Sequence, residues 1–93
     1  MNPKKKWYFY VLWCKDNTMY TGVTTDVDRR LKEHNEKKGA KYTRSRIPVS
    51  ILYSREMENR STAQKLESAF KKLTRNNKLI KLTQMVDEDH GLV

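Results

Sequence analysis

A chain of 93 residues is long enough for one compact core and too short for two. It contains no apolar run near the roughly 20 residues that a membrane-spanning helix needs, and its basic start, Met1 to Lys6, lacks the apolar core of a signal peptide. The formal net charge of +9 favours a polyanion as partner, with nucleic acid considered first.

The positive charge is concentrated in the first half of the chain. Residues 1–50 contain 12 Lys or Arg against 5 Asp or Glu, a net +7, whereas residues 51–93 contain 8 against 6, a net +2. Cys14 is the only cysteine, which excludes an internal disulfide and a zinc site of paired cysteines and agrees with a reducing compartment. We therefore expect a soluble cytoplasmic protein, either a monomer or a weak homodimer.

The first two elements predict a β-hairpin. Residues 7–14 are all apolar or aromatic, as in a strand that is covered on both faces. The polar turn formers of residues 15–18 separate this segment from a second strand over residues 19–23. Gly22 inside the second strand indicates that another group approaches its backbone closely.

A helix is expected over residues 25–36. Thr25 can cap its first turn, where two aspartates suit the positive end of the helix dipole. Arg30 and His34 project within roughly 60° of Val27, on the margin of the inward face, so we expect them to line a cleft.

Residues 37–46 are typical of a basic surface loop, since they include five basic residues, one glycine and no acidic residue. Such a loop suits contact with the phosphates of a nucleic acid, and its tyrosine could stack on a base or pack beneath the loop. A loop that only improves solubility is the alternative. The nucleic-acid contacts expected here are Lys37, Lys38, Lys41, Tyr42, Arg44 and Arg46.

The second half of the chain predicts one strand, over residues 49–53, and two helices. The first helix begins at Ser61, because Ser61 and Gln64 form a capping-box pattern. Asn76-Asn77 ends that pattern, and a short further helix is expected around residues 79–82. The apolar stripe that should face the sheet comprises Ala63, Leu66, Ala69, Phe70 and Leu73.

The order ββαβα(α) predicts an α+β fold, in which a small three-stranded antiparallel sheet is flanked by helices. We expect a single domain over residues 1–93. Its core should span about residues 7–82, and residues 83–93, which turn acidic at Asp87, should form a flexible tail.

Two tyrosine-containing triplets, Tyr-Phe-Tyr at residues 8–10 and Tyr-Thr-Gly at residues 20–22, precede an Arg and a His on one helix and a Glu on a later one. This arrangement resembles the GIY-YIG nuclease family, although the first triplet lacks the Gly and Ile of the family name. Residues 39–48 are similar to those of compact single-domain bacterial members. The residues that match by type, order and spacing are Tyr10, Tyr20, Gly22, Arg30 and Glu67.

The resemblance implies a metal-dependent endonuclease that hydrolyses phosphodiester bonds of nucleic acid, DNA foremost. Glu67 would hold Mg²⁺ or Mn²⁺, because Mg²⁺ takes one or two carboxylates together with waters and substrate phosphate. Arg30 would hold the scissile phosphate with its planar fork of donors. Tyr20 would accept the proton of the attacking water and Tyr10 would orient water or phosphate. His34 would relay a proton or contact phosphate.

The same residues have simpler interpretations. Tyrosines on strands usually pack, and a mid-helix glutamate such as Glu67 commonly pairs with a lysine four positions on, here Lys71. Tyr10 and Tyr20 can share a site only on one sheet face, which requires cross-strand partners whose numbers have an even sum, such as Tyr10 opposite Gly22. The alternative functions are a non-catalytic DNA- or RNA-binding module that retains the nuclease fold, and an interaction domain whose charge serves only solubility.

Overall fold

The computed structural model describes residues 5–90 of the chain. Its elements follow the order ββαβαα, with a short 3₁₀ turn, η1, before the third strand. The three strands form one antiparallel sheet in the order β2-β1-β3, which confirms the predicted α+β class. The bounds of the elements are β1 Trp7–Trp13, β2 Met19–Thr24, α1 Val27–Asn35, η1 Lys41–Thr43, β3 Ser50–Met57, α2 Arg60–Lys71 and α3 Arg75–Asp89.

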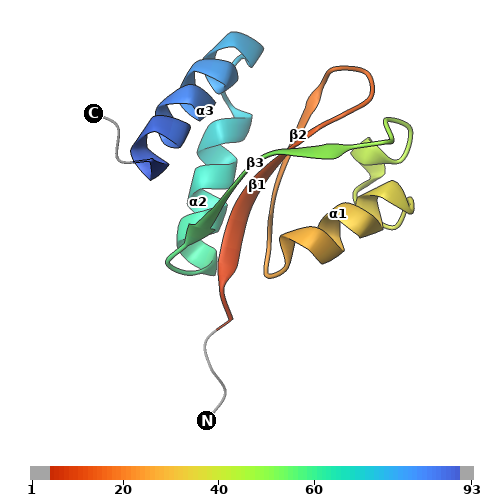
Figure 1. The fold of residues 1–93 in the computed structure, drawn as a ribbon, viewed down its shortest axis with the longest axis horizontal. Helices are drawn as coiled ribbons and strands as arrows, with labels where there is room; N and C mark the ends of the chain where they lie inside the picture. Colours follow the sequence, from red (N-terminus) through yellow and green to blue (C-terminus); the bar gives the residue numbers. More distant parts are fainter. Residues whose placement is uncertain (1–4, 91–93) are drawn as a thin grey trace.

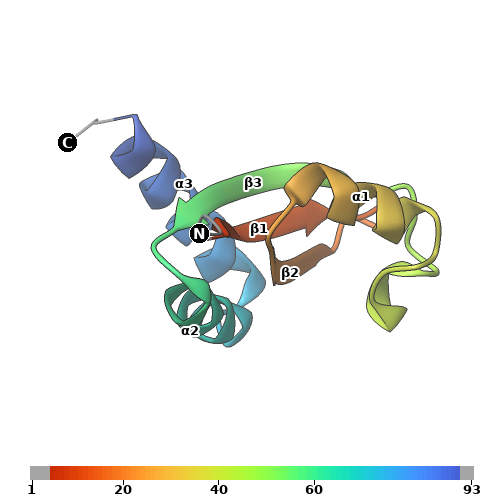
Figure 2. The ribbon, with the colours of Figure 1, turned by 90° about the horizontal axis from the view of Figure 1, so that it is seen from below.

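Helices cover both faces of the sheet. Figures 1 and 2 show α1 over one face and α2, with α3 beside it, over the other. Because side chains alternate along a strand, Phe9 and Val11 of β1 pack with Phe70 of α2, whereas Tyr10 and Leu12 belong to the cluster against which Leu31 of α1 packs. This double coverage is why β1 is an unbroken run of apolar and aromatic residues. No helix within residues 5–90 is long and apolar enough to cross a membrane.

The register of the β1–β2 pair brings the two tyrosines to one face. Tyr10 lies opposite Gly22 and Leu12 lies opposite Tyr20, so the cross-strand numbers have the even sum that a shared site requires. A Cβ atom on Gly22 would lie 2.6 Å from the hydroxyl oxygen of Tyr10. The glycine is therefore needed because the Tyr10 side chain crosses directly over the backbone of β2.

The capping residues of two helices lie one or two positions before or after the predicted ones. The carboxylate of Asp26, and not Thr25, caps α1 by accepting from the backbone N–H of Arg29 at 3.0 Å. The side chain of Asn59, and not Ser61, caps α2 by accepting from the N–H of Thr62 at 2.8 Å. In both places a neighbouring Asp or Asn, which is at least as good a cap as Ser or Thr, occupies the capping position.

The third strand is longer than predicted. β3 continues four residues past the expected end at residue 53, because its second half pairs with β1 from Val11 to Trp7, where Trp7 lies opposite Met57. The hydropathy of residues 54–57 does not reveal this pairing, since the strand is at the edge of the sheet and several of its side chains face solvent.

The last helix is also longer than predicted. Thr74 caps α3 through the N–H of Asn77 at 3.2 Å, so Asn76-Asn77, which was expected to break the helix, forms its first turn. The segment expected to be a flexible tail from residue 83 is helical as far as Asp89. The remaining residues of that expected tail, 91–93, lie outside the described residues.

Side chains of β3 hold the C-terminal end of α3. The hydroxyl of Tyr53 donates to the carboxylate of Asp89, and the guanidinium of Arg55 donates to the same carboxylate at 2.6 Å. Arg55 also donates to the backbone carbonyl of Met85 at 3.2 Å. These contacts connect residues 30 to 36 positions apart and explain why this acidic segment is ordered as helix.

Candidate active site

The centre of the site is a buried contact between β1 and α1. The hydroxyl of Tyr10, which is 1% exposed, lies 3.0 Å from Nε2 of His34. On the other side of the imidazole, Nδ1 lies 2.8 Å from the hydroxyl oxygen of Thr43 in η1. The side chain of Asn35 exchanges hydrogen bonds with the backbone of Val49 at 2.7 and 3.0 Å and so fixes the end of α1 against the start of β3.

His34 is more deeply buried than the helical periodicity predicted. Its exposed fraction is 0%, and both ring nitrogens face protein partners, so it does not reach a phosphate from this position. Burial, and then the nearby charge of Arg30, lower the pKa of His34 to about 4. The ring is therefore neutral at neutral pH, and its two nitrogens face Tyr10 and Thr43.

Thr43 was not anticipated from the sequence. Its hydroxyl donates to the carbonyl of Ala40, three residues earlier, at 2.9 Å. Threonine hydroxyls in turns often bond a nearby backbone group, so this local hydrogen bond could have been predicted from the sequence. The contact between Thr43 and His34 could not be predicted from the sequence, because it depends on how the loop folds back over α1.

Tyr20 is the more accessible of the two tyrosines. Its ring centroid lies 6.4 Å from that of Tyr10, 5.1 Å from that of His34 and 6.0 Å from that of Tyr42. The ring is partly exposed. Tyr20 is therefore placed to meet a substrate, with the buried Tyr10–His34 pair behind it.

Arg30 lies beside this pair on α1. Burial raises the pKa of Tyr10 to about 12, and the nearby guanidinium of Arg30 opposes that rise. Arg30 also donates to the carboxylate of Glu33 at 3.1 Å and keeps 30% of its side chain exposed. Its position beside Tyr10 and its exposure allow it to contact an anion that enters the site.

Glu67 reaches the site from α2, on the other side of the sheet. Its carboxylate is the weakest of the causes that raise the pKa of Tyr10, after burial of the phenol and the charge of Tyr20. The ion pair with Lys71 that the spacing predicted is present, at 3.1 Å, and the Glu67 side chain is 21% exposed. The structure thus brings Tyr10, Tyr20, Arg30 and His34 together, while Glu67 on α2 is paired with Lys71.

A hollow of about 280 Å³ lies at this rim. Lys71 and Lys78 form one wall of it, and the aromatic side chains of Tyr20 and Tyr42 form another, so helix α2, the start of α3 and η1 all border it. Its two ammonium groups and its aromatic wall suit a nucleotide chain better than an uncharged ligand.

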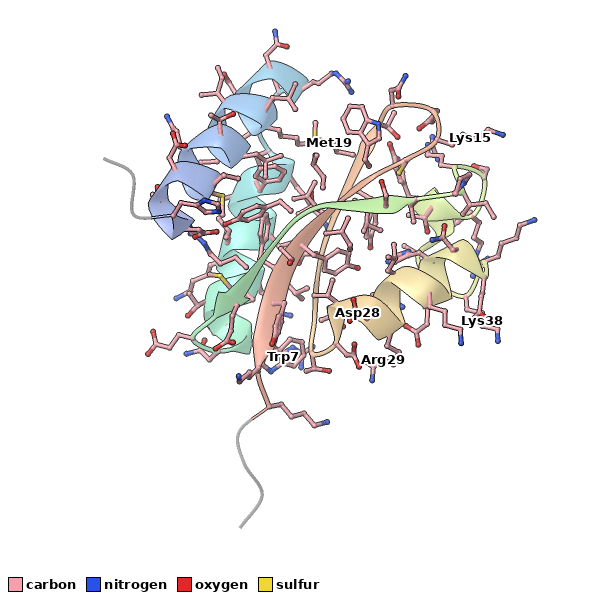
Figure 3. All side chains as sticks on the ribbon, in the orientation of Figure 1. Trp7, Lys15, Met19, Asp28, Arg29 and Lys38 are labelled. Atoms are coloured by element: carbon pink, nitrogen blue, oxygen red, sulfur yellow. The ribbon has the colours of Figure 1, made fainter. Side chains whose placement is uncertain are left out.

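Some residues of the basic loop contact other parts of the protein, and others are exposed to solvent. Arg46 donates to the carboxylate of Asp16 at 3.0 Å and to the carbonyl of Tyr42 at 2.7 Å, and its guanidinium lies 3.9 Å from the Tyr42 ring centroid. Arg46 and Tyr20 both lie against the Tyr42 ring, which favours packing over base stacking. Figure 3 shows Lys38 extending outward beyond α1, on the same side as Lys15. The exposed basic residues of the loop are Lys37, Lys38, Lys41 and Arg44.

The described carboxylate, imidazole and thiol groups do not form a closed metal site. Within residues 5–90 there is no cluster of three or more His, Cys, Asp or Glu side chains that could enclose an ion. A single partly exposed carboxylate, Glu67, fits a hard cation such as Mg²⁺, which keeps several waters and takes its remaining ligands from substrate phosphate. It does not fit a structural zinc site.

Comparison with known proteins agrees with this geometry. Residues 6–80 match the model of the GIY-YIG catalytic domain. A UPF0213 protein from Streptococcus agalactiae is 52% identical over 81 residues, covering 87% of this chain and 92% of that protein. A solution NMR structure of a protein from E. faecalis is 46% identical with a TM-score of 0.60, covering 92% of this chain and 93% of the other. A second NMR structure, of a UPF0213 protein from Bacillus halodurans, is 42% identical with a TM-score of 0.57, covering 85% and 84%. The chain therefore belongs to the GIY-YIG catalytic domain family, a nuclease-type family that acts on nucleic acid and generally depends on a divalent metal.

Proposed function

We propose that this protein is a metal-dependent endonuclease that hydrolyses phosphodiester bonds of nucleic acid, with DNA as the expected substrate. The observation that carries the proposal is the convergence of Tyr10, Tyr20, Arg30 and His34, from three elements, at one edge of the sheet. Phosphodiester hydrolysis needs a proton acceptor and a cation for the developing charge, and this edge offers both. We expect the protein to act in the cytoplasm, as a monomer or a weak homodimer.

Each side chain has a role that its position supports. Tyr20, partly exposed at the rim, would accept the proton of the attacking water. Arg30 would bind the scissile phosphate with its exposed guanidinium, which can present two parallel donors. Tyr10 would orient water or phosphate from behind, since its hydroxyl is held by His34.

Glu67 would hold Mg²⁺ or Mn²⁺, which supplies charge stabilisation for the leaving oxygen. The ion pair with Lys71 has a consequence for this role, because the same carboxylate cannot face an ammonium group and a divalent cation at once. We infer that Lys71 turns toward the hollow that it lines with Lys78 when the metal is bound. There it would meet a phosphate of the substrate strand.

The basic loop would hold the phosphate backbone next to the site. Lys37, Lys38, Lys41 and Arg44 are exposed on the segment that also carries Tyr42 and Thr43. Contacts of this kind position a nucleic acid and carry little sequence information. We therefore expect binding that depends strongly on salt and weakly on sequence. Arg46 and Tyr42 would support the shape of the loop.

The test is a Mg²⁺ and Mn²⁺ titration of strand cleavage on labelled duplex, branched and single-stranded DNA and RNA. Wild type would be compared with Glu67→Gln and Tyr20→Phe, and with the matched changes Glu58→Gln and Tyr8→Phe outside the site. We expect cleavage that requires metal, is lost in the first pair and is retained in the second. Binding without cleavage on every substrate, unchanged by any variant, would make the non-catalytic binding module the correct function.

A further inference from the structure

Thr43 has only one hydroxyl proton to donate, and the groups around it indicate where that proton goes. The Thr43 hydroxyl lies 2.9 Å from the carbonyl oxygen of Ala40, which can only accept, so the hydroxyl proton is directed there. The contact of 2.8 Å between Thr43 and Nδ1 of His34 then requires that the imidazole be the donor. Nδ1 of His34 therefore carries a proton.

This assignment determines the other side of the ring. A neutral imidazole has one N–H, so a proton on Nδ1 leaves a lone pair on Nε2. The contact of 3.0 Å between Nε2 and Tyr10 must then be donated by the phenol. The complete chain runs from the Tyr10 hydroxyl to His34, from His34 to Thr43, and from Thr43 to the backbone of Ala40.

Packing holds the His34 ring in these hydrogen bonds. Tyr10, His34 and Thr43 are at most 1% exposed, so water does not compete for their hydrogen bonds. A Cβ atom on Gly39 would lie 2.3 Å from Nδ1 of His34, which shows that the loop backbone rests against the imidazole. The asymmetry between the two ring nitrogens therefore originates in the loop, and not in α1.

We propose that Thr43 is a positioning residue that sets the tautomer of His34 and, through it, the direction of the Tyr10 hydroxyl. With the phenolic proton directed inward to Nε2, the oxygen lone pairs of Tyr10 face away from His34, toward the side of the neighbouring Arg30. The opposite tautomer would donate to Tyr10 and would occupy one of those lone pairs. This inference rests on the proposed function, since it concerns how Tyr10 orients water or phosphate.

The test compares Thr43→Val, which keeps the shape and removes the hydroxyl, with Thr43→Ser, which keeps the hydroxyl. Thr83→Val is a matched control, since the Thr83 hydroxyl bonds only the carbonyl of Leu79 on α3 among the described residues. Nitrogen-15 NMR of histidine-labelled protein distinguishes the two ring nitrogens of His34. We expect the proton on Nδ1 in wild type, in Thr43→Ser and in Thr83→Val. In Thr43→Val we expect it on Nε2 for a substantial fraction of molecules.

Cleavage kinetics supply a second readout. We expect Thr43→Val to lower kcat by roughly ten- to a hundredfold, as loss of a supporting hydrogen bond does at other sites, with KM little changed. Thr43→Ser should restore most of the rate. A proton on Nε2 in wild type overturns the inference whatever the cleavage result, as does a Thr43→Val variant with unchanged tautomer and rate. Cleavage that does not depend on Glu67 would instead overturn the proposed function and leave the tautomer assignment in place.

Discussion

The two glycines beside the site are there because larger residues would displace the side chains of the site. Gly22 lies under the Tyr10 ring and Gly39 lies against the His34 ring. Tyr10 and His34 are in turn bonded to each other. The glycine backbone therefore packs directly against both side chains, Gly22 against Tyr10 and Gly39 against His34. A side chain added at either glycine should displace the hydrogen-bonded Tyr10–His34 pair.

Gly22→Ala tests this contact. The added methyl group would lie within 2.6 to 2.9 Å of three Tyr10 atoms, so the ring must shift, and we expect a loss of about 1–3 kcal/mol in the free energy of unfolding. Tyr10→Phe removes the nearest of these atoms. Urea denaturation of both single variants and the double variant should give a double-variant loss smaller than the sum. Strict additivity would show that the methyl group and the phenol do not meet.

The neutral His34 predicts a pH dependence of stability. Its folded pKa of about 4 is below the ordinary value of 6.5, so the unfolded chain takes up the proton first. The stability that the neutral ring contributes is thus complete above pH 6.5 and is lost as the pH falls toward 4. Between pH 7 and pH 5 we expect the free energy of unfolding to fall by about 2 kcal/mol.

Urea denaturation across that interval measures this fall, and two histidine variants assign it. His34→Gln should flatten the dependence, whereas His90→Gln, which changes the only other histidine of the chain, should leave it in place. The interval lies above the pH at which carboxylates normally titrate. An equally steep dependence in His34→Gln would show that another group is responsible.

At the scale of elements, the sequence was informative where local patterns decide the structure. The apolar run of β1 and the turn after it predicted the hairpin, and its register is the one that a site shared by Tyr10 and Tyr20 requires. The residues that were missed depend on distant partners. Thr43 meets His34 only after the loop has closed, and the end of α3 is helical because Tyr53 and Arg55 hold Asp89. Neither contact has a signature in the spacing of residues.

Asp89→Asn tests whether that contact holds α3 against the sheet. The bond from Tyr53 and the guanidinium of Arg55 together lower the pKa of Asp89, so the structure favours its charged form. Removing the charge should cost roughly 0.5–1 kcal/mol, because the carboxylate is partly exposed. Hydrogen exchange should accelerate in the last turns of α3 while β1 and β2 are unaffected. Asp87→Asn, the same change at an exposed residue two positions earlier, should have little effect on either measurement.

At the scale of the whole molecule, charge is distributed so that a polyanion is directed to one edge of the sheet. A hollow of about 490 Å³ at the start of α1 is lined by Asp26, Asp28 and Glu56, which repel phosphate. The hollow beside Tyr20 is lined by two lysines, and the exposed basic loop follows α1 at its other end. A field of this shape would raise the local concentration of a polyanion beside Tyr20.

The salt dependence of binding locates that contact surface. Each phosphate contact that is lost lowers the slope of log affinity against log salt by roughly one unit. Lys38→Ala/Lys41→Ala should therefore reduce the slope by about two units and weaken binding to all sequences alike, as measured by fluorescence anisotropy on duplex DNA across a range of salt. Lys65→Ala/Lys72→Ala removes the same charge from exposed positions at α2, outside the loop. Because the two double variants have equal net charge, a general field effect would lower both slopes equally, whereas direct contact by the loop lowers only the first.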